Sequence, residues 1–216
     1  MTRRFWPHGR LATKPETEDV VRTLAEAFYE DPVWGWAFDD GARRLEQHSA
    51  WFRLVVNSGI EHGAVWTTPG YEAVSVWVPP GCPELLPADE ALLQPTIERL
   101  TGDRAAVILS AFDRFEAMHP HDSEHHYLSL LATRTRHRGH GYGMRLLGEN
   151  LARLDAEGAA AYLESTNPAN VRRYQAAGFE LMSSYELADG GPPVDQMWRA
   201  PRHLNITRGP ELSNAP

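Results

Sequence analysis

Polar and hydrophobic positions alternate with period two in several short stretches of the chain, which is the pattern of half-buried β-strands. The clearest stretch is residues 72–78, in which every second residue from Val74 onward is a valine. The Pro69–Gly70 turn joins this stretch to residues 64–67 in a predicted β-hairpin. Further strands are expected at residues 10–13, 127–133, 160–165, 179–187 and 194–199.

Hydrophobic residues recur at helical spacing in the segments between these strands. The first helix is expected to start at residues 15–18, where carboxylates lie in its first turn. It is expected to end at Asp31–Pro32, because the residue before a proline disfavours the α region. A tryptophan-rich loop is predicted over residues 33–40. Further helices are predicted at residues 42–60, 88–100, 104–118, 141–156 and 168–177.

Three glycines, at positions 139, 141 and 143, lie between the predicted strand 127–133 and the predicted helix 141–156. A glycine-rich turn that opens a helix presents backbone N–H groups without an obstructing Cβ, and this geometry binds a pyrophosphate. A P-loop would need Lys-Ser or Lys-Thr after the glycines, and a dinucleotide fingerprint would need Gly-x-Gly-x-x-Gly. The chain has neither, which leaves the pattern Arg-x-x-Gly-x-Gly from Arg138 onward. The alternative is a glycine turn that binds no ligand.

This pattern, with the segment 162–180 that follows it, resembles the two halves of the acyl-CoA site in the Gcn5-related N-acetyltransferases (GNATs). The second segment contains an apolar strand, a polar turn, a helix start and a Gly178–Phe179 exit. The resemblance implies an α/β fold with a mixed, twisted central sheet flanked by helices. It also implies acetyl-CoA as co-substrate and direct transfer of the acetyl group to a primary amine. A likeness to the puromycin N-acetyltransferase-like members is carried by residues 10–13, 20–28 and 74–80.

The resemblance also assigns roles to single residues. Tyr174 corresponds to the general acid that protonates the departing thiolate, because a tyrosine with a pKa of about 10 keeps its proton at neutral pH; a structural role is the alternative. Leu131 and Thr133 would pair with the pantetheine amides through their backbones. Asn167 and Asn170 are candidate helix caps, and Asn170 would also contact the pantetheine or phosphate portion of CoA. The phosphate-binding turn would consist of Arg138, Gly139, His140, Gly141, Tyr142 and Gly143.

The base and the acceptor pocket are assigned from their expected positions. Glu164 lies on the strand beside the expected thioester and either takes the amine proton or is a buried structural carboxylate; Asp31 and Glu61 are the alternative bases. The histidines between 119 and 126 lack the spacing of a zinc site, so no metal is expected. Tryptophans in the N-terminal half belong either to the core or to a cleft for an aromatic, aminoacyl-type acceptor. The substrate-binding residues are expected to be Asp31, Trp34, Trp36, Trp77 and His126.

Composition narrows the class of protein. The formal net charge of -8 disfavours non-specific nucleic-acid binding and favours a cationic amine, although the same charge also serves solubility. The one cysteine, Cys82, excludes an internal disulfide. No apolar run reaches the ~20 residues of a membrane helix, and the N-terminus does not resemble a signal peptide. A cytoplasmic protein without nucleic-acid or membrane partners is therefore expected.

One acetyltransferase domain is expected over residues 10–202, preceded by an extension over 1–9 and followed by a loosely ordered tail over 203–216. The expected partner is a small-molecule amine, of antibiotic-like or aminoacyl type by the resemblance, and homodimerisation is left open. Two alternatives remain for the function. One is acetylation of a protein or peptide amine, and the other is a non-catalytic regulator that binds acyl-CoA.

Overall fold

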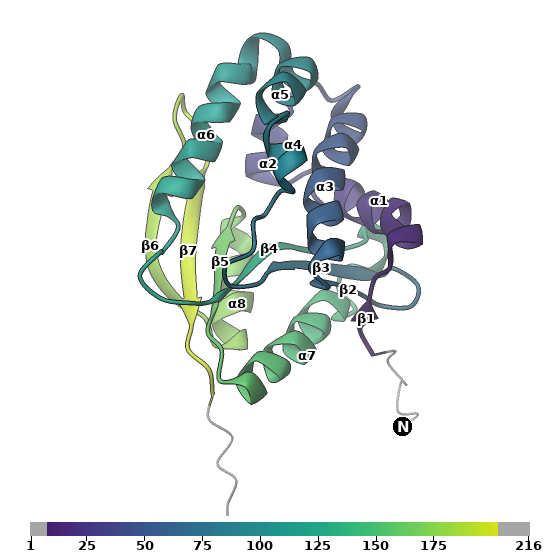
Figure 1. Cartoon of the computed structure of the whole chain (residues 1–216), viewed down its shortest axis with the longest axis vertical. Coiled ribbons are helices and arrows are strands. Elements are labelled where there is room, and N and C mark those ends of the chain that lie inside the picture. Colours follow the sequence, from purple (N-terminus) through teal and green to yellow (C-terminus); the bar gives the residue numbers. More distant parts are fainter. Residues whose placement is uncertain (1–7, 203–216) are drawn as a thin grey trace, which may run out of the picture.

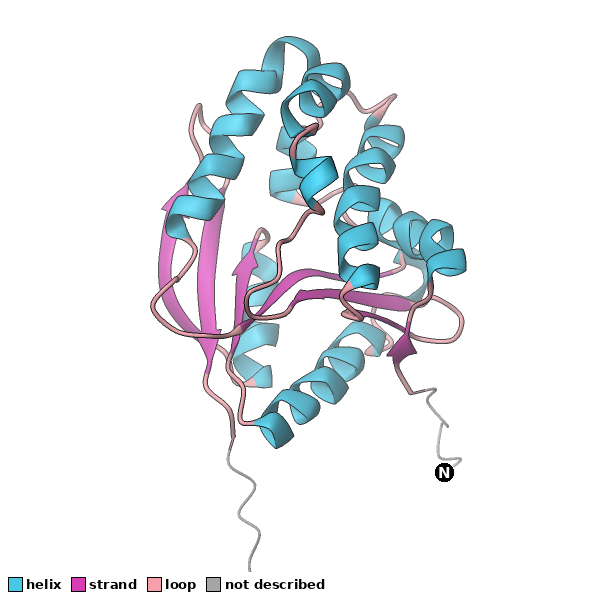
Figure 2. Cartoon of the chain, viewed as in Figure 1, coloured by secondary structure: helices cyan, strands magenta, loops and turns pink. Residues whose placement is uncertain are grey.

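The computed structural model describes residues 8–202, and these form a mixed sheet between two layers of helices (Figures 1 and 2). The strand order is β1-β2-β3-β4-β5-β7-β6, and among the described strands only β4 and β5 pair in parallel. This architecture confirms the mixed, helix-flanked sheet expected from the sequence. The tail over 203–216 and most of the N-terminal extension lie outside the described residues. The strands are β1 (Arg10–Leu11), β2 (Val65–Thr67), β3 (Ala73–Val78), β4 (His126–Thr133), β5 (Ala161–Ser165), β6 (Glu180–Glu186) and β7 (Pro193–Arg199).

Two large hydrophobic cores lie on opposite faces of the sheet. One core is formed with α1, α3, α5 and α6, and the other with α7 and α8 (Figure 1). No helix among residues 8–202 is both long and apolar enough to cross a membrane. The α-helices are α1 (Thr17–Ala27), α2 (Pro32–Ala37), α3 (Arg44–Glu61), α4 (Pro87–Glu90), α5 (Leu93–Thr101), α6 (Ala105–Met118), α7 (Tyr142–Glu157) and α8 (Val171–Ala177). Short 3-10 helices span Lys14–Glu16, Gly102–Arg104, Thr135–His137 and Pro168–Asn170.

Residues 33–40 are not a loop as expected, because α2 occupies most of them. The Asp31 carboxylate accepts hydrogen bonds from the backbone N–H groups of Val33 at 3.0 Å and Trp34 at 3.2 Å. Pro32 takes the first helical position, where its missing N–H would have no intrahelical acceptor in any case. Since α1 already ends at Ala27, the Asp31–Pro32 pair starts a helix instead of ending one.

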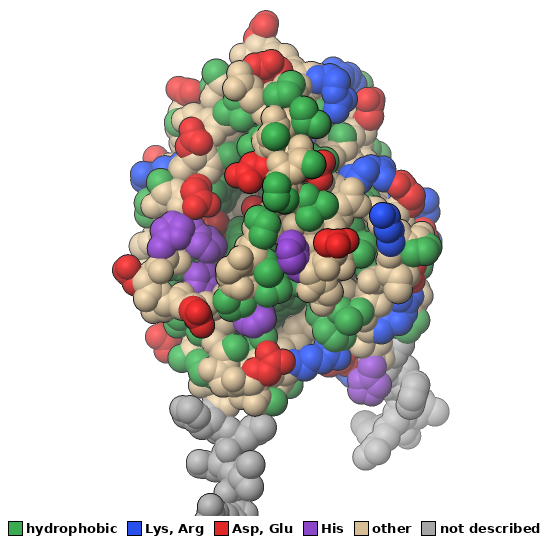
Figure 3. All heavy atoms as spheres, viewed as in Figure 1, with side chains coloured by type: hydrophobic (Ala, Val, Ile, Leu, Met, Phe, Trp, Pro, Cys, Tyr) green, Lys and Arg blue, Asp and Glu red, His purple; other side chains and the backbone are tan. Residues whose placement is uncertain are grey.

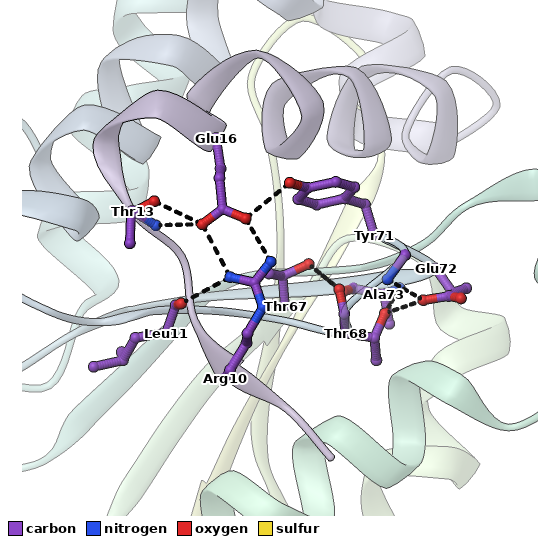
Figure 4. A network of polar contacts seen from close by, with 10 residues as sticks. Arg10, Leu11, Thr13, Glu16, Thr67, Thr68, Tyr71, Glu72 and Ala73 are labelled. Atoms are coloured by element: carbon purple, nitrogen blue, oxygen red, sulfur yellow. Dashed lines mark hydrogen bonds and ion pairs between the residues drawn. The ribbon is translucent and has the colours of Figure 1, made fainter. Parts of the chain in front are cut away.

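Polar contacts attach the short edge strand β1 to the start of the first helical segment (Figure 4). The Arg10 guanidinium donates two hydrogen bonds to the Glu16 carboxylate, at 2.9 and 2.5 Å. Glu16 also accepts from the backbone N–H of Thr13 at 3.0 Å and from the Tyr71 hydroxyl at 2.8 Å. Arg10 and the other donors hold the pKa of Glu16 well below its usual range. These four residues are not part of the cavity described below.

Ser129 is an extra residue in β4 and forms a β-bulge. Trp77 pairs with Leu128 and the preceding Val76 pairs with Leu130, so no residue of β3 lies opposite Ser129. Side chains normally alternate along a strand, and an extra residue reverses that alternation. Leu128 accordingly packs in the α7–α8 core, whereas Leu130 packs in the core with α1 and α3.

The two central strands separate at the level of this bulge. β4 and β5 pair at three positions, the last of which joins Leu128 to Leu163. Beyond that pair, the edge of β4 that faces β5 has no partner among the described strands. The strands therefore leave a gap in the middle of the sheet.

Candidate active site

A cavity of about 800 Å³ opens where β4 and β5 separate. Its walls include residues 127–131 of β4 and residues 163–166 at the end of β5. The end of β3 with the loop after it, residues 78–85, and the face of α6 complete the enclosure on the side of the first core. The bulge and the divergence of the two strands thus position the site.

The glycine turn lies at the start of α7 as predicted. Gly139 and Gly141 have φ angles of 77° and 81°, and a Cβ at either residue would meet nothing within 4 Å. Both therefore need the left-handed conformation, and both leave open space above their backbones. Gly143 has a different reason for lacking a side chain, because a Cβ there would lie 2.5 Å from Thr133 Oγ1 of β4. The first-turn amides of Gly143 and Met144 precede the first helical hydrogen bond, from Arg145 N to Gly141 O.

Side chains of the turn make contacts within the protein. The Arg138 guanidinium donates to the carbonyl oxygen of Ala27, the last residue of α1, at 2.5 Å. The His140 ring donates through Nδ1 to the Arg138 carbonyl at 2.9 Å, and the Tyr142 ring packs on His137 with centroids 5.6 Å apart. Arg138 is therefore used to dock the turn on α1, and the backbone is the part of the turn that faces open space.

Tyr174 of α8 lines the cavity and is partly buried against Phe179, with ring centroids 6.1 Å apart. Burial, with the nearby Asp31 carboxylate, raises the pKa of Tyr174 to about 12. The hydroxyl therefore carries its proton throughout the neutral range. A protonated hydroxyl in this position can serve as a proton donor.

Asn170 also lines the cavity, at the end of the 3-10 helix before α8, and its side chain accepts from Arg173 at 2.7 Å. It does not cap α8. Asn167 does act as a cap, since its carboxamide oxygen accepts from the backbone N–H of Ala169 at 3.0 Å. The cap at Asn167 is therefore confirmed, whereas a contact of Asn170 with CoA stays a prediction.

Glu164 lies on β5 and lines the cavity. The Tyr185 hydroxyl donates to its Oε1 at 2.8 Å and the Tyr127 hydroxyl donates to its Oε2 at 3.2 Å. Burial raises the pKa of Glu164 to about 7, although the tyrosine hydroxyl groups oppose that increase. A carboxylate with a pKa near neutrality is suited to accept a proton from an amine.

Three histidines line the cavity beside the end of α6, and Figure 3 shows histidine side chains gathered on this face. The His125 ring contacts the Ser123 carbonyl through Nδ1 at 2.8 Å, which requires Nδ1 to carry the proton. His119 Nε2 lies 3.0 Å from His125 Nε2 and is then the donor, so its own Nδ1 is an acceptor. Burial, with His125 and His121 nearby, lowers the pKa of His119 to about 4. Among residues 8–202, no group of three or more His, Cys, Asp or Glu side chains could hold a metal ion.

The cavity lining combines aromatic rings with carboxylates. Within the described chain, no Lys or Arg belongs to the lining. Glu84 is attached to the bulge, because the Ser129 hydroxyl donates to it, and burial raises its pKa. Asp31 accepts a third hydrogen bond, from the Thr166 hydroxyl at 2.9 Å. The acidic lining residues are Asp31, Glu84, Glu90, Asp113, Glu116, Glu124 and Glu164, and the aromatic ones include Phe28, Trp34, Trp51, Phe112 and Phe115.

Several predicted residues lie away from the cavity lining. Trp77 faces α7, where its Nε1 donates to the Asn150 side chain at 3.1 Å. Trp36 packs on the first core and on a smaller cluster of buried residues, with the Arg104 guanidinium 5.4 Å from its ring. His126 starts β4 outside the lining, and Glu61 is exposed at the end of α3. Asp31, Trp34, Glu164, Asn170, Tyr174 and Leu131 are the predicted residues that the fold brings to one cavity.

Three further residues of the site were not predicted from the sequence: Tyr127 and Glu84, which line the cavity, and Tyr185, which contacts Glu164. Tyr127 occupies the same predicted strand as Leu131, and its place opposite Tyr162 follows from parallel pairing of that strand with β5. Tyr185 reaches Glu164 from β6, although β7 lies between β5 and β6. The available signal for Tyr127 was a hydroxyl-bearing side chain near the start of a largely apolar strand. No local signal points to Tyr185 or Glu84.

Comparisons with known proteins find similar sequences and similar folds. Residues 87–179 match the model of the acetyltransferase (GNAT) family. A Corynebacterium glutamicum protein described as histone acetyltransferase HPA2 and related acetyltransferase is 25% identical, with a TM-score of 0.68 over 94% of this chain and 100% of that chain. Drosophila melanogaster polyamine N-acetyltransferase (17% identity, TM-score 0.58, 91% and 99% coverage) shares the fold. So does arylalkylamine N-acetyltransferase 2 from Aedes aegypti (11%, 0.58, 90% and 99%). Residues 87–179 are thus similar to the acetyltransferase (GNAT) family, and the chain shares its fold with the acetyltransferases named above.

Proposed function

We propose that the protein transfers an acetyl group from acetyl-CoA to the primary amine of a small molecule. The observation that carries this proposal is that Glu164 and Tyr174, one suited to accept a proton and the other to donate one, line a single cavity at the gap between β4 and β5. Acetyl transfer to an amine needs both functions, because the amine loses a proton and the departing thiolate gains one. A regulator that only bound acyl-CoA would need neither.

The glycine turn and the gap suit acetyl-CoA, which supplies the acetyl thioester. The open space above Gly139 and Gly141 admits a phosphate to the backbone, and the first-turn amides of α7 offer hydrogen-bond donors. The unpaired edge of β4 at Leu131 offers backbone groups to the pantetheine amides in the manner of an added strand. Thr133 lies further along the same edge and packs against Gly143.

In this arrangement Glu164 takes the proton of the bound amine, and Tyr174 gives its proton to the sulfur of the leaving thiolate. The amine nitrogen attacks the thioester carbonyl directly, within a complex of both substrates. Initial-rate measurements should then give intersecting lines in double-reciprocal plots. The cavity wall contains Cys82, and parallel lines would indicate an acetylated enzyme instead.

The lining favours a cationic acceptor with an aromatic or apolar portion. Carboxylates attract an ammonium ion, and the aromatic wall buries a ring or an alkyl chain. This lining is compatible with an aminoacyl, puromycin-like compound and with the arylalkylamines and polyamines named for two proteins of the same fold. In Figure 3 the Lys and Arg side chains lie mainly toward the periphery of the face, which leaves acidic, histidine and hydrophobic groups at its centre.

The proposed function is tested by assaying release of the CoA thiol with a panel of amines. We expect turnover with small cationic amines, and faster turnover for those that carry an aromatic ring than for aliphatic monoamines of equal charge. The panel should contain arylalkylamines, polyamines, aminoglycosides, puromycin-like nucleosides and a lysine-containing peptide. Turnover of the peptide alone would favour protein acetylation, and acetyl-CoA binding without turnover of any amine would favour the regulator.

Substitution of Gly141 by valine should abolish measurable acetyl-CoA binding in calorimetry while the protein stays folded. The new side chain would occupy the space above the turn, and a β-branched residue at a φ of 81° is strained by about 1–2 kcal/mol. Gly158→Val is the matched control. Gly158 ends the same helix at a φ of 68°, and a Cβ at that position would meet nothing within 4 Å, so the control should cost similar stability and leave the affinity unchanged. Equal affinity in both variants would contradict the phosphate-turn assignment.

A further inference from the structure

Two tyrosine hydroxyl groups from different strands hold the carboxylate of Glu164. Tyr185 on β6 donates to Oε1 and Tyr127 on β4 donates to Oε2, so each oxygen has its own donor. Rotation of the carboxylate about its terminal bond would break both hydrogen bonds. The function proposed above uses Glu164 but gives no part to these hydroxyl groups.

We propose that Tyr127 and Tyr185 are positioning residues for the reaction, which fix the orientation of the Glu164 carboxylate at the cavity wall and stabilise its charged form. This inference rests on the proposed role of Glu164 as the base. An ionised carboxylate accepts hydrogen bonds more strongly than a neutral carboxylic acid, so the two donors favour ionisation. Without these two donors, burial would raise the pKa of Glu164 further, and the carboxyl group would stay neutral up to a higher pH.

Other titratable groups face Glu164 from the neighbouring strand ends. The carboxylate of Glu84, in the loop after β3, disfavours ionisation of Glu164. Tyr162, two residues earlier on β5, acts in the opposite direction and lowers the pKa of Glu164. The Tyr162 hydroxyl also accepts from Gln196 of β7 at 2.7 Å. Tyr162 therefore divides its hydroxyl between two partners.

Two residues on and just after α6, Arg114 and His119, contact the rings of the two positioning tyrosines. The Arg114 guanidinium lies 5.3 Å from the Tyr185 ring centroid. The neutral ring of His119, just after α6, packs against Tyr127 with centroids 5.0 Å apart. These contacts hold the rings from which the two hydroxyl groups reach Glu164.

Both tyrosines are packed through their rings, and this makes the hydroxyl groups separable by mutation. Tyr185 is 6% exposed and packs edge-on against Phe115, with centroids 6.1 Å apart. Phenylalanine at either position keeps the ring and its packing and removes one donor. The effect on Glu164 can therefore be measured in a folded protein.

The test compares Tyr185→Phe, Tyr127→Phe and the double variant with the unmodified protein. Two readouts are used: the pH profile of kcat/KM, and a carbon-13 NMR titration of the Glu164 carboxyl, identified by its absence from Glu164→Gln. In Tyr185→Phe we expect two midpoints to move upward by about one pH unit: the midpoint at which kcat/KM rises with pH, here called the acidic limb, and the midpoint of the NMR titration. A shift of this size corresponds to the loss of one hydrogen bond to a charged group. Tyr127→Phe should give a smaller shift, because its bond is longer, and the double variant a larger one.

Tyr71→Phe is the matched control. It removes a hydroxyl that donates to the carboxylate of Glu16 at 2.8 Å, far from the cavity lining, so it should move neither readout. A loss of stability alone would lower the rate at every pH without displacing the limb. If Tyr185→Phe does not fold, Tyr127→Phe on the opposite oxygen applies the same test.

An unchanged NMR titration in the double variant would overturn the inference. If the NMR titration shifts but the pH profile of kcat/KM does not, the two tyrosines do hold Glu164. The same result would show that Glu164 is not the base of the reaction. The two proposals therefore fail by different results.

Discussion

Replacement of Tyr174 by phenylalanine is expected to lower kcat by about 10²-fold or more, while the dissociation constant for acetyl-CoA stays nearly unchanged. The substitution keeps the ring that packs on Phe179 and removes only the hydroxyl at the cavity. Because the pKa of Tyr174 is raised to about 12, the hydroxyl holds its proton over the whole range in which the enzyme would work. Steady-state kinetics and calorimetry on the same preparation measure the two quantities.

The leaving group provides an internal control for the Tyr174 variant. A thiolate that is a weak base can leave an acetyl thioester without being protonated. With such a thioester as the acetyl donor, the variant should therefore lose much less of its rate. Tyr29→Phe is the control in the protein, since the Tyr29 hydroxyl donates to the Gly41 carbonyl at 3.0 Å and does not line the cavity. Wild-type kcat in a folded Tyr174→Phe protein, with chemistry limiting turnover, would remove Tyr174 from the mechanism and leave water as the proton source.

Glu164→Gln is expected to lower kcat/KM by about 10²- to 10⁴-fold at pH 8, the range attributed to a positioned acid or base. Glutamine keeps the shape of the side chain but cannot accept a proton from the amine. In the unmodified protein, kcat/KM should rise with pH up to about 7 and then level off, because the pKa of Glu164 is raised to about 7 and only the carboxylate is the base. The variant should lack this acidic limb.

The sign of the stability effect gives an independent check on Glu164. Its pKa is higher in the folded protein than the ordinary value for glutamate, so the folded state binds the proton more tightly and stability falls as pH rises from about 4.5 to about 7. Glu164→Gln should lose this part of the pH dependence in denaturant unfolding. Glu61→Gln, at an exposed carboxylate outside the cavity, should keep both the rate profile and the stability profile. A rate limb that survives in Glu164→Gln would transfer the base to another group.

Much of the local structure could be read from short patterns. Alternating valines marked β3, and the Pro69–Gly70 turn marked its hairpin, because side chains alternate along a strand and turns need particular residues. The glycines at 139 and 141 indicated a turn before α7, since both adopt positive φ. Asp31–Pro32 showed the limit of such rules. The same pair can end one helix or cap the next, and only the position of the last turn of α1 decides between them.

The sequence also indicated candidate residues for the chemistry, but not all of the contacts that these and nearby residues make. Tyr174 and Glu164 could be selected because both lie in the segment 162–180, which resembles the second half of the GNAT acyl-CoA site. The role of Gly143 differed from expectation, as its missing Cβ makes room for Thr133 of β4 and not only for a ligand. That contact joins a helix to a strand ten residues earlier, and glycine spacing alone cannot distinguish it from a phosphate contact.

Most helices, strands and turns, including the glycine turn, can thus be located from local patterns, and the tyrosine on α8 from the resemblance to a known family. The contacts of Tyr127 and Tyr185 with Glu164 cannot, because these tyrosines lie 37 and 21 residues from Glu164 along the chain. They meet it because β4 pairs in parallel with β5 and because β7 inserts between β5 and β6. Local patterns depend on neighbours within a few residues, whereas strand order depends on how the hydrophobic faces of the whole chain pack together, so this part of the site exists only once the sheet has formed.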